Sequence, residues 1–479
     1  MRHPFLLCFL LLCACPSSAS NDDDSADDDD AVDDDDAADD DDAADDDDAA
    51  DDDDSGDDDD ATPQIDDIDG ILAFAALAST TVDDLDALAH DVAWGGGWPL
   101  FDGSRWLFLT RWDANLEGVS LVGDINGWDT AAHPALRSAS GRHYLAVVPD
   151  ADLAAAPEGA KYKWFQDQKP YRAPPEATAY GFDEFGRFGY VRPPLNEPWR
   201  EQFPAFASAH LATARGFRAL LPAGFVPRSP SASALRSLLV QDGQNVFDED
   251  GVNGGWGLDE ALVNEGITDV VVLGIDNAAD RIAAYTHVQD ELPTDGTTIG
   301  GQAPAYADLV YLEALPWFRA RYGLVASGDS LAVMGSSLGG LVSLYLAMTH
   351  PDEQGCVMAL SSTLGWGAFG PTRPGDDALA RLWPTSHGHG SAAIYLDSGG
   401  GVNGTCDDVD GDGVQEDAAD SDNYCSTLQM RDVLEGVGYA FDVDLWHWHE
   451  PFAGHNEAAW GARVPQALAA CSLGGWSTP

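Results

Sequence analysis

Apolar and polar positions over residues 210–475 alternate between short apolar runs and longer amphipathic stretches. The apolar runs predict buried strands at 217–225, 235–244, 270–275, 331–334, 356–361, 392–396 and 441–446. The stretches between them predict helices at 258–265, 306–322, 426–436 and 457–470. Because strands that alternate with helices form a mainly parallel sheet covered on both faces, this half is predicted to have an α/β fold.

The first half of the chain has a different pattern. Residues 63–99 predict one or two helices closed by a run of glycines. Residues 100–195 contain short apolar runs separated by Gly, Pro and Asp, which is typical of a small β-sandwich. Residues 193–215 contain prolines and are predicted to be a linker to the α/β half.

One strand of the α/β half leads into a short serine motif. The apolar run 331–334 is followed by Gly335-Ser-Ser-Leu-Gly339 and then by a helical pattern up to His350. Strand, G-x-S-x-G and helix in that order form a nucleophile elbow, which exposes a serine hydroxyl on a strained turn. The pattern predicts Ser337 as a nucleophile.

A serine nucleophile needs a base and an acid that orients the base. His455 lies on the predicted loop between strand 441–446 and the last helix, where a base is expected. His447 and His449 are alternatives. At spacing i, i+2 they share one strand face and could bind a metal with a carboxylate, although no companion ligand motif is visible.

The acid is expected after the strand at 392–396, where the chain carries an insertion between Cys406 and Cys425. Asp422 lies where the chain leaves this insertion just before a helix, and it is our prediction for the acid. Asp397 and Asp407 are alternatives.

The insertion also contains part of a calcium-loop pattern. Asp408, Asp410 and Asp412, followed by Gly413, match oxygen ligands at positions 1, 3 and 5 and a turn glycine at position 6. Position 12 is Ala419, so the missing ligand is expected from Asp417 or Asp420. We predict a structural calcium ion held by Asp408, Asp410, Asp412 and Asp417, and no cofactor for catalysis; the alternative is a solvated acidic loop.

Residues 1–20 have the shape of a signal peptide, and 12–15 resemble a bacterial lipobox that would place lipid on Cys15. The predicted location is therefore an outer-membrane or cell-surface lipoprotein, with a periplasmic or secreted protein as the alternative. In an exported chain the four remaining cysteines predict two disulfides. Three pairings exist, and the economical one joins Cys406 to Cys425 and Cys356 to Cys471.

The distribution of charge along the chain predicts a tether and disfavours nucleic acid as a partner. Residues 21–62 repeat four aspartates and two small residues, which predicts an extended disordered segment. The 27 aspartates of residues 22–60 account for part of the net charge of −60 and leave −33 elsewhere. A chain this acidic disfavours nucleic acid as a partner, and membrane contact is expected only through the lipid anchor.

These segments resemble a known family. The runs 240–247 and 272–277, with Arg281 and Tyr285, the elbow at Ser337 and the segment 454–460 are similar to the esterase branch of the α/β-hydrolases, which contains esterase D and enterochelin esterase. The resemblance covers roughly 210–472. It implies an α/β-hydrolase fold and a Ser-His-Asp triad of Ser337, His455 and Asp422. It also implies an oxyanion hole formed by the backbone N–H groups of Leu338 and Gln244.

The upstream segment has its own resemblance. Residues 119–128 look like a strand and turn of early-set immunoglobulin-like domains, which precede glycan-active enzymes and enterochelin esterases. Trp128 or Trp164 would then stack on a glycan, or the module would only cap the active site. We therefore expect an exported serine carboxylesterase acting on a small-molecule or glycan-linked ester. The alternatives are an acyltransferase with the same triad and a non-catalytic glycan-binding surface lipoprotein.

Overall fold

A computed structural model describes most of the chain from residue 67 onward. The described residues are 67–153, 158–167, 171–247, 254–292, 294–370, 377–386, 388–402, 406–417, 420–473 and 476. The predicted signal peptide, the lipidation site Cys15 and the tether 21–62 lie outside the described residues. Within them, no helix combines the length and apolar character that crossing a membrane requires.

The first described elements are two helices and a small four-stranded sheet. Helix α1 (Ile68–Ala76) and helix α2 (Val82–Gly95) precede the strands, and Thr81 with Asp84 forms a capping box at the start of α2. One sheet has the order β1-β2-β6-β5. Its strands are β1 (Leu100–Phe101), β2 (Arg105–Arg111), β5 (Leu136–Arg137) and β6 (His143–Pro149), and the short helix α3 (Asp150–Leu153) follows.

The second group of strands faces the first across a shared core. It consists of β3 (Ser120–Gly123), β4 (His133–Pro134), β7 (Lys161–Phe165), β8 (Ala179–Asp183) and β9 (Gly186–Tyr190). The core between the two groups contains Phe108, Leu121, Tyr144 and Trp164. Trp164 is fully buried, so it does not present the stacking surface that the sequence suggested. Trp128 remains partly exposed and lies near Tyr171.

The α/β half is organised around a mainly parallel sheet. Its strand order is β10-β11-β13-β12-β16-β17-β18-β20, and every neighbouring pair from β13 to β20 is parallel. The strands are β10 (Trp199–Phe206), β11 (Arg215–Leu221), β12 (Arg236–Gln241), β13 (Val270–Ile275), β16 (Leu331–Ser336), β17 (Cys356–Leu360), β18 (Ala393–Gly400) and β20 (Leu445–His449). The short strand β19 (Ser421–Asp422) pairs antiparallel with the end of β18.

Helices cover both faces of this sheet, as the sequence predicted. Alternate strand residues face opposite cores: Leu239 and Val333 contact one, whereas Leu238 and Met334 contact the other. The covering helices are α4 (Gly243–Phe247), α5 (Leu258–Asn264), α7 (Ala303–Asp308), α8 (Leu315–Tyr322), α9 (Leu338–Thr349), α10 (Leu379–Ser386), α11 (Tyr424–Val437) and α12 (Glu457–Leu473). Smaller elements are α6 (Arg281–Ala284), the hairpin β14 (Gln289–Glu291) and β15 (Thr298–Gly300), and two 3₁₀ turns at Ala232–Ala234 and Gly328–Ser330.

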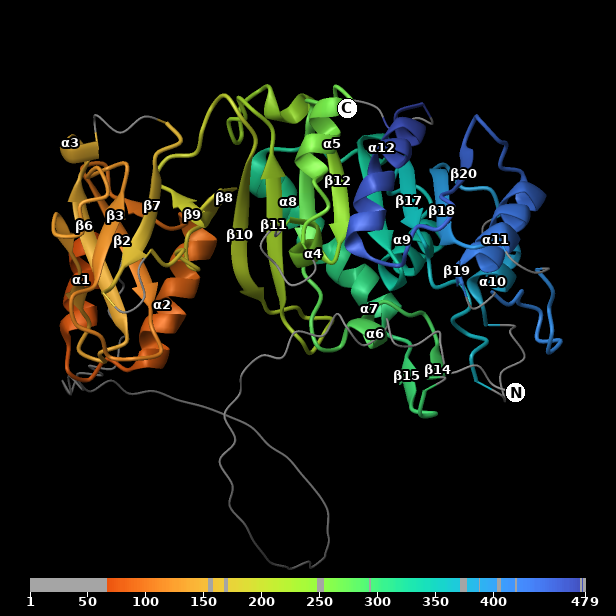
Figure 1. Ribbon diagram of the computed structural model, residues 1–479, viewed down its shortest axis with the longest axis horizontal. Coiled ribbons are helices and arrows are strands. Elements are labelled where there is room, and N and C mark those ends of the chain that lie inside the picture. Colours follow the sequence, from red (N-terminus) through yellow and green to blue (C-terminus); the bar gives the residue numbers. More distant parts are fainter. Residues whose placement is uncertain are drawn as a thin grey trace, which may run out of the picture.

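The two halves share one hydrogen-bonded sheet. β10 pairs with β11 on one side and with β8 on the other, through Arg200 opposite Tyr180 and Glu201 opposite Ala179. Figure 1 shows the N-terminal strands at one end of the molecule and β18, β20 and α11 at the other, with β10 between them.

Strand β10 lies where the sequence predicted a linker. The sequence pattern does not predict this strand because it contains charged residues and a proline. Arg200 and Glu201 are buried, and Pro204 falls in a stretch where the register with β11 shifts. Arg200 lies 3.1 Å from Asp259, and Glu201 accepts a hydrogen bond from Tyr322 at 2.8 Å. Tertiary partners thus satisfy charges that argue against a strand in the sequence alone.

Two other predictions were wrong in detail. The helix predicted over 306–322 is interrupted by a π-helical segment, Leu309–Ala314, before α8. Pro316 has no N–H and cannot close the usual bond to Leu312, so the backbone shifts register there. The last strand begins at Leu445 rather than at 441, because Asp442 adopts a left-handed conformation with φ of 59°.

Both predicted disulfides are present. Cys356 on β17 is joined to Cys471 on α12 across a sequence separation of 115, and Cys406 is joined to Cys425 across 19. The second bond closes the acidic insertion at the carboxyl end of the sheet.

Candidate active site

The elbow at Ser337 has the strained geometry that the motif predicts. Ser337 separates β16 from α9 and has φ of 57° and ψ of −123°. A side chain at Gly335 would collide with the carbonyl oxygen of Gly339, so the tight strand–helix approach requires glycine. The turn places the Ser337 hydroxyl 3.3 Å from that of Thr363 and at the wall of a cavity.

His455 and Asp422 meet at the same cavity. Nδ1 of His455 lies 2.5 Å from Oδ1 of Asp422, and the carboxylate is only 4 % exposed. The other carboxylate oxygen accepts a hydrogen bond of 2.6 Å from the Ser361 hydroxyl. Asp422 is at Nδ1, so Nε2 is the ring nitrogen that a serine triad would use toward the serine hydroxyl.

The structure distinguishes the three candidate acids. Asp397 is fully buried and forms an ion pair with Arg463 of α12, with Nε 3.0 Å from Oδ2. Burial raises the pKa of Asp397 to about 6, although Arg463 opposes that shift. Asp407 is exposed and does not line the cavity. Asp422 is the candidate that contacts His455.

Three residues that the sequence did not single out hold this arrangement together. Ser361, at the end of β17, accepts a hydrogen bond of 2.6 Å from Arg463 and donates one to Asp422. Its backbone N–H donates to Asp397 at 3.0 Å. Thr363 contacts the Ser337 hydroxyl. No local motif marks these residues, because their roles arise from contacts between strands and a helix far apart in sequence.

The predicted oxyanion residues lie beside the elbow. Leu338 begins α9 directly after Ser337, where helix N–H groups have no partner within the helix. Gln244 belongs to α4, which follows Asp242 at the end of β12. Asp242 is buried and held by Arg281, with Nε 2.7 Å from Oδ1, and a side chain at Gly339 would approach its carboxylate within 3.1 Å. The segment that carries Gln244 is therefore anchored against the elbow.

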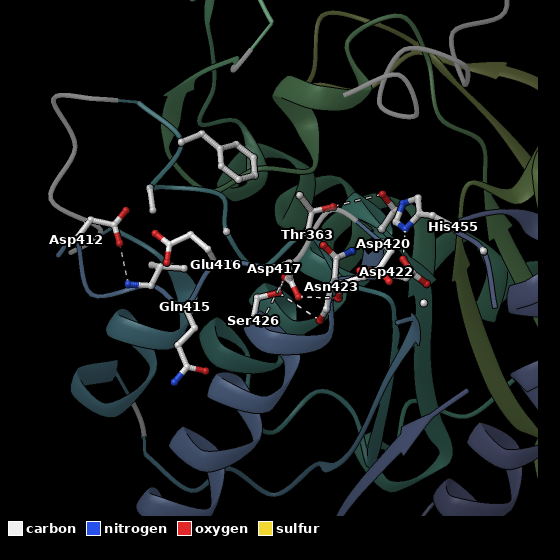
Figure 2. A pocket seen from close by; sticks show the side chains of 18 of the residues that line it. Thr363, Asp412, Gln415, Glu416, Asp417, Asp420, Asp422, Asn423, Ser426 and His455 are labelled. Atoms are coloured by element: carbon white, nitrogen blue, oxygen red, sulfur yellow. Dashed lines mark hydrogen bonds and ion pairs between the residues drawn. The ribbon is translucent and has the colours of Figure 1, made fainter. Parts of the chain in front are cut away.

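The acidic insertion forms the opposite wall of a cavity of about 480 Å³. One part of it is lined by Ser337, Thr363, Asp422 and His455. Much of the remainder is lined by residues of the insertion between 410 and 417 and between 420 and 423. In Figure 2, Asp412 and Glu416 lie toward one end of the cavity and His455 toward the other. The volume is typical of a pocket for a small molecule.

The predicted calcium ligands form a cluster with one difference. Ligand oxygens of Asp408, Asp410, Asp412 and Glu416 lie within 4.8 Å of one another, so Glu416 takes the place predicted for Asp417. Burial raises the pKa of both Asp412 and Glu416, and neighbouring carboxylates add to that effect.

Asp417 has another role. It accepts hydrogen bonds of 2.6 Å from the Cys425 N–H and 2.8 Å from the Ser426 hydroxyl at the start of α11. A carboxylate at this position caps the helix and complements its dipole. The proposed alternative, Asp420, lines the catalytic cavity and is not in the cluster.

His447 and His449 lie on β20 and do not join that cluster. Nδ1 of His449 lies 3.0 Å from the Ser398 hydroxyl. Burial lowers the pKa of His447 to about 4, which keeps its imidazole neutral near pH 7.

The strand order, the elbow after β16 and the loops that carry Asp422 and His455 define an α/β-hydrolase fold. Residues 208–471, more than half of the chain, match the family described as "Putative esterase". The chain belongs to this family and is an ester-hydrolysing enzyme.

Curated relatives match parts of the chain. It is 25 % identical over 193 residues to the uncharacterized protein YbbA of Bacillus subtilis, which covers 40 % of this chain and 70 % of YbbA. It is 29 % identical over 153 residues to the iron(III) salmochelin esterase of Escherichia coli, covering 32 % of this chain and only 34 % of that esterase.

A solved structure of the enterobactin esterase FES from Shigella flexneri, in the presence of enterobactin, is 14 % identical and has a TM-score of 0.41. That match covers 78 % of this chain and 94 % of FES. Similarity this low carries no argument about substrate, and the fold assignment rests on the strand order and the family.

Proposed function

We propose that the protein is an exported serine carboxylesterase in which Ser337 is the nucleophile, His455 the general base and Asp422 the acid that orients the base. One observation carries the proposal. The contact of 2.5 Å between His455 and Asp422 lies on the same cavity as the strained serine of the elbow. Membership of the esterase family supports ester hydrolysis as the reaction.

The geometry supports a two-step reaction. The Ser337 oxygen attacks the ester carbon while its proton passes to Nε2 of His455, and Asp422 stabilises the resulting imidazolium. The alcohol then leaves with that proton, and an acyl-enzyme remains on Ser337. Water attacks the acyl group and gives a proton to His455, which passes it to the Ser337 oxygen as the acid leaves, so that the serine hydroxyl and the neutral imidazole are restored. Backbone N–H groups of Leu338 and Gln244 are the proposed donors to the oxyanion.

Substitution of Ser337 tests the proposal. Ser337→Ala is expected to lower kcat for a p-nitrophenyl ester by about 10³-fold or more and to abolish labelling by a fluorophosphonate probe. Ser336→Ala is the matched control, because Ser336 is the preceding serine and is also buried. Undiminished turnover and labelling in Ser337→Ala would disprove the assignment. Transfer of the acyl group to an added alcohol in preference to water would instead assign an acyltransferase.

Export is part of the proposal. The two disulfides are typical of proteins outside the cytoplasm, and the sequence of residues 1–20 has signal-peptide character. Lipid on Cys15, followed by the acidic tether, would hold the esterase at a distance from a membrane. The intact mass of protein from the membrane fraction measures the lipid directly, and Cys15→Ser is expected to move the protein into the soluble fraction.

A structural calcium ion at Asp408, Asp410, Asp412 and Glu416 completes the proposal. These residues occupy positions 1, 3, 5 and 9 of the loop pattern, and all four are carboxylates, which suit a hard cation. Calcium at about 100 times its Kd would add about 2.7 kcal/mol of stability. The melting temperature is therefore expected to fall by a few degrees when EDTA replaces calcium. Asp408→Asn with Asp410→Asn should remove that difference, whereas the exposed control Asp352→Asn should keep it.

A further inference from the structure

The charged side chains that line the cavity beside Ser337 are mostly acidic. Acidic residues lining it are Asp410, Asp412, Glu416, Asp417, Asp420 and Asp422. None of the described residues that line it is lysine or arginine, and His455 is the one basic side chain among them. Arg381 lies beside Gly413, and Arg463 lies 3.7 Å from Asp422, but neither lines the cavity.

This imbalance is not shared by another cavity in the described part of the chain. That cavity, of about 410 Å³ between α2, the small sheets and β10, contains Asp86 and Glu176 together with Arg111 and two histidines. Basic side chains face the acids of this cavity, with Arg111 Nε 3.2 Å and His143 Nε2 2.8 Å from Oδ1 of Asp86. The acidity of the catalytic cavity is therefore a local property and does not simply follow the net charge of the chain.

Two of the acids in this cavity hold other parts of the site in place. Asp422 contacts His455, and Asp417 accepts hydrogen bonds at the start of α11. The other acids that line it are Asp410, Asp412, Glu416 and Asp420, and Asp412 and Glu416 accept hydrogen bonds from the N–H groups of Val414 and Val409. A bound divalent cation at the cluster of four carboxylates would still leave that cluster with excess negative charge. The field inside the cavity is negative whether or not calcium is bound.

The rest of the wall supplies apolar surface close to these acids. Phe369, Ala368 and Val414 also line the cavity. Buried Asp290 holds the segment that carries Phe369 by accepting hydrogen bonds from the N–H groups of Gly367 at 2.7 Å and Phe369 at 3.0 Å. An aromatic ring next to carboxylates is a favourable surface for an organic cation, which gains from both.

We infer that the ester this enzyme prefers carries a positively charged group, such as a quaternary or protonated amine, which the acids between 410 and 417 and Asp420 attract while Ser337 attacks the ester. The inference rests on the proposed function. Figure 2 places Asp412 and Glu416 at the far end of the cavity from His455, so the charge and the ester are expected to be separated by a spacer within the substrate.

Matched esters test this inference. One member of each pair carries a trimethylammonium group and the other its uncharged isostere, in which carbon replaces nitrogen; a third ester carries a carboxylate. Pairs are made with the charge in the alcohol or in the acyl part, on short and longer spacers. For at least one pair, kcat/KM of the cationic ester is expected to exceed that of the isostere by about tenfold or more, and the ratio should shrink as salt is raised.

Substitution of the cavity carboxylates shows which of them cause the preference for cationic esters. Asp412→Asn with Glu416→Gln, and separately Asp420→Asn, are expected to lower the cationic-to-neutral ratio, mainly through the KM of the cationic ester. Asp352→Asn and Glu435→Gln neutralise exposed carboxylates outside the cavity and should leave the ratio unchanged. Assays in calcium and in EDTA should both show the preference, with the larger ratio in EDTA.

Equal kcat/KM for all cationic and neutral pairs, or a preference for the anionic ester in calcium, would overturn the inference. If Ser337→Ala also abolishes hydrolysis of the neutral esters in that case, the esterase assignment stands and only the charge preference is wrong. Full activity in Ser337→Ala would instead disprove the proposed function itself.

Discussion

Two carboxylates lie at the end of β18, and the structure gives them different surroundings. Asp422 contacts His455, whereas Asp397 is fully buried against Arg463. Ser361 connects them, because its backbone N–H donates to Asp397 and its hydroxyl donates to Asp422. These surroundings support the proposal that Asp422 is the acid of the triad, and we propose a positioning role for the Asp397–Arg463 pair.

Isosteric amides separate the two roles. Asp422→Asn is expected to lower kcat by about 10³–10⁴-fold, since it removes the negative charge and the tautomer control at His455. Asp397→Asn leaves Arg463 buried beside a neutral group, so it should lower the free energy of unfolding by about 3–5 kcal/mol with a much smaller effect on kcat. Chemical denaturation and kinetics on both variants measure this, and a larger kcat loss in Asp397→Asn would reverse the assignment.

His447 is a second residue whose environment leads to a prediction. Burial lowers its pKa from 6.5 to about 4, and its Nε2 has no hydrogen-bond partner among the described residues. Between these pH values the unfolded chain binds a proton that the folded protein does not. Stability from this residue is therefore present above pH 6.5 and is lost as the pH falls toward 4.

The expected loss is about 3 kcal/mol over that range. His447→Gln should remove this component, so its free energy of unfolding should fall less steeply with decreasing pH than that of the parent protein. Denaturation series at several pH values measure the slope. His389→Gln, at a histidine that is 43 % exposed, controls for substitution as such. Parallel curves for parent and His447→Gln would contradict the prediction.

At the scale of elements, the insertion closed by Cys406 and Cys425 determines the site. It supplies the acidic wall of the cavity, the carboxylate cluster and, in β19, Asp422 itself. β19 pairs with the end of β18 through Asp422 opposite Gly399. Asp417, Cys425 and Ser426 then join the insertion to the start of α11.

Removal of each disulfide should have a different consequence. Cys406→Ser with Cys425→Ser releases the loop that carries Asp422, and kcat/KM is expected to fall by about 10- to 100-fold, because small displacements of catalytic groups are costly. Cys356→Ser with Cys471→Ser opens a longer loop far from the cavity and should lower the melting temperature more while affecting kcat less. Equal kinetic effects would show that the small loop does not position the acid.

At the scale of the whole molecule, one sheet runs from the N-terminal strands into the α/β half through β8, β10 and β11. β10 is fixed on both edges by hydrogen bonds, and Arg200 and Glu201 are buried between the halves with their partners. The N-terminal strands therefore pack as an extension of the catalytic half (Figure 1).

Local signals were sufficient for much of this architecture. Alternating apolar runs predicted β11, β12, β13, β16, β17 and β18, since each is a continuous buried segment whose pattern depends on its own residues. The G-x-S-x-G motif located the elbow, because a side chain at Gly335 would collide with the backbone of Gly339, and one at Gly339 would crowd the side chains of Gln241 and Asp242. The four cysteines predicted both disulfides.

By itself, then, the sequence determined the α/β order, the strained serine and the loop in which a base and an acid should lie, because these depend on short-range periodicity and steric limits. Only the tertiary structure decided which carboxylate meets His455, that Glu416 joins the cluster while Asp417 caps α11, and that residues 199–206 form a strand. The His455 contact and the strand depend on partners far away in the chain, whereas the roles of Glu416 and Asp417 depend on how the insertion folds onto itself and onto the start of α11. Burial and ion pairing with distant residues outweigh the local preference of a charged side chain.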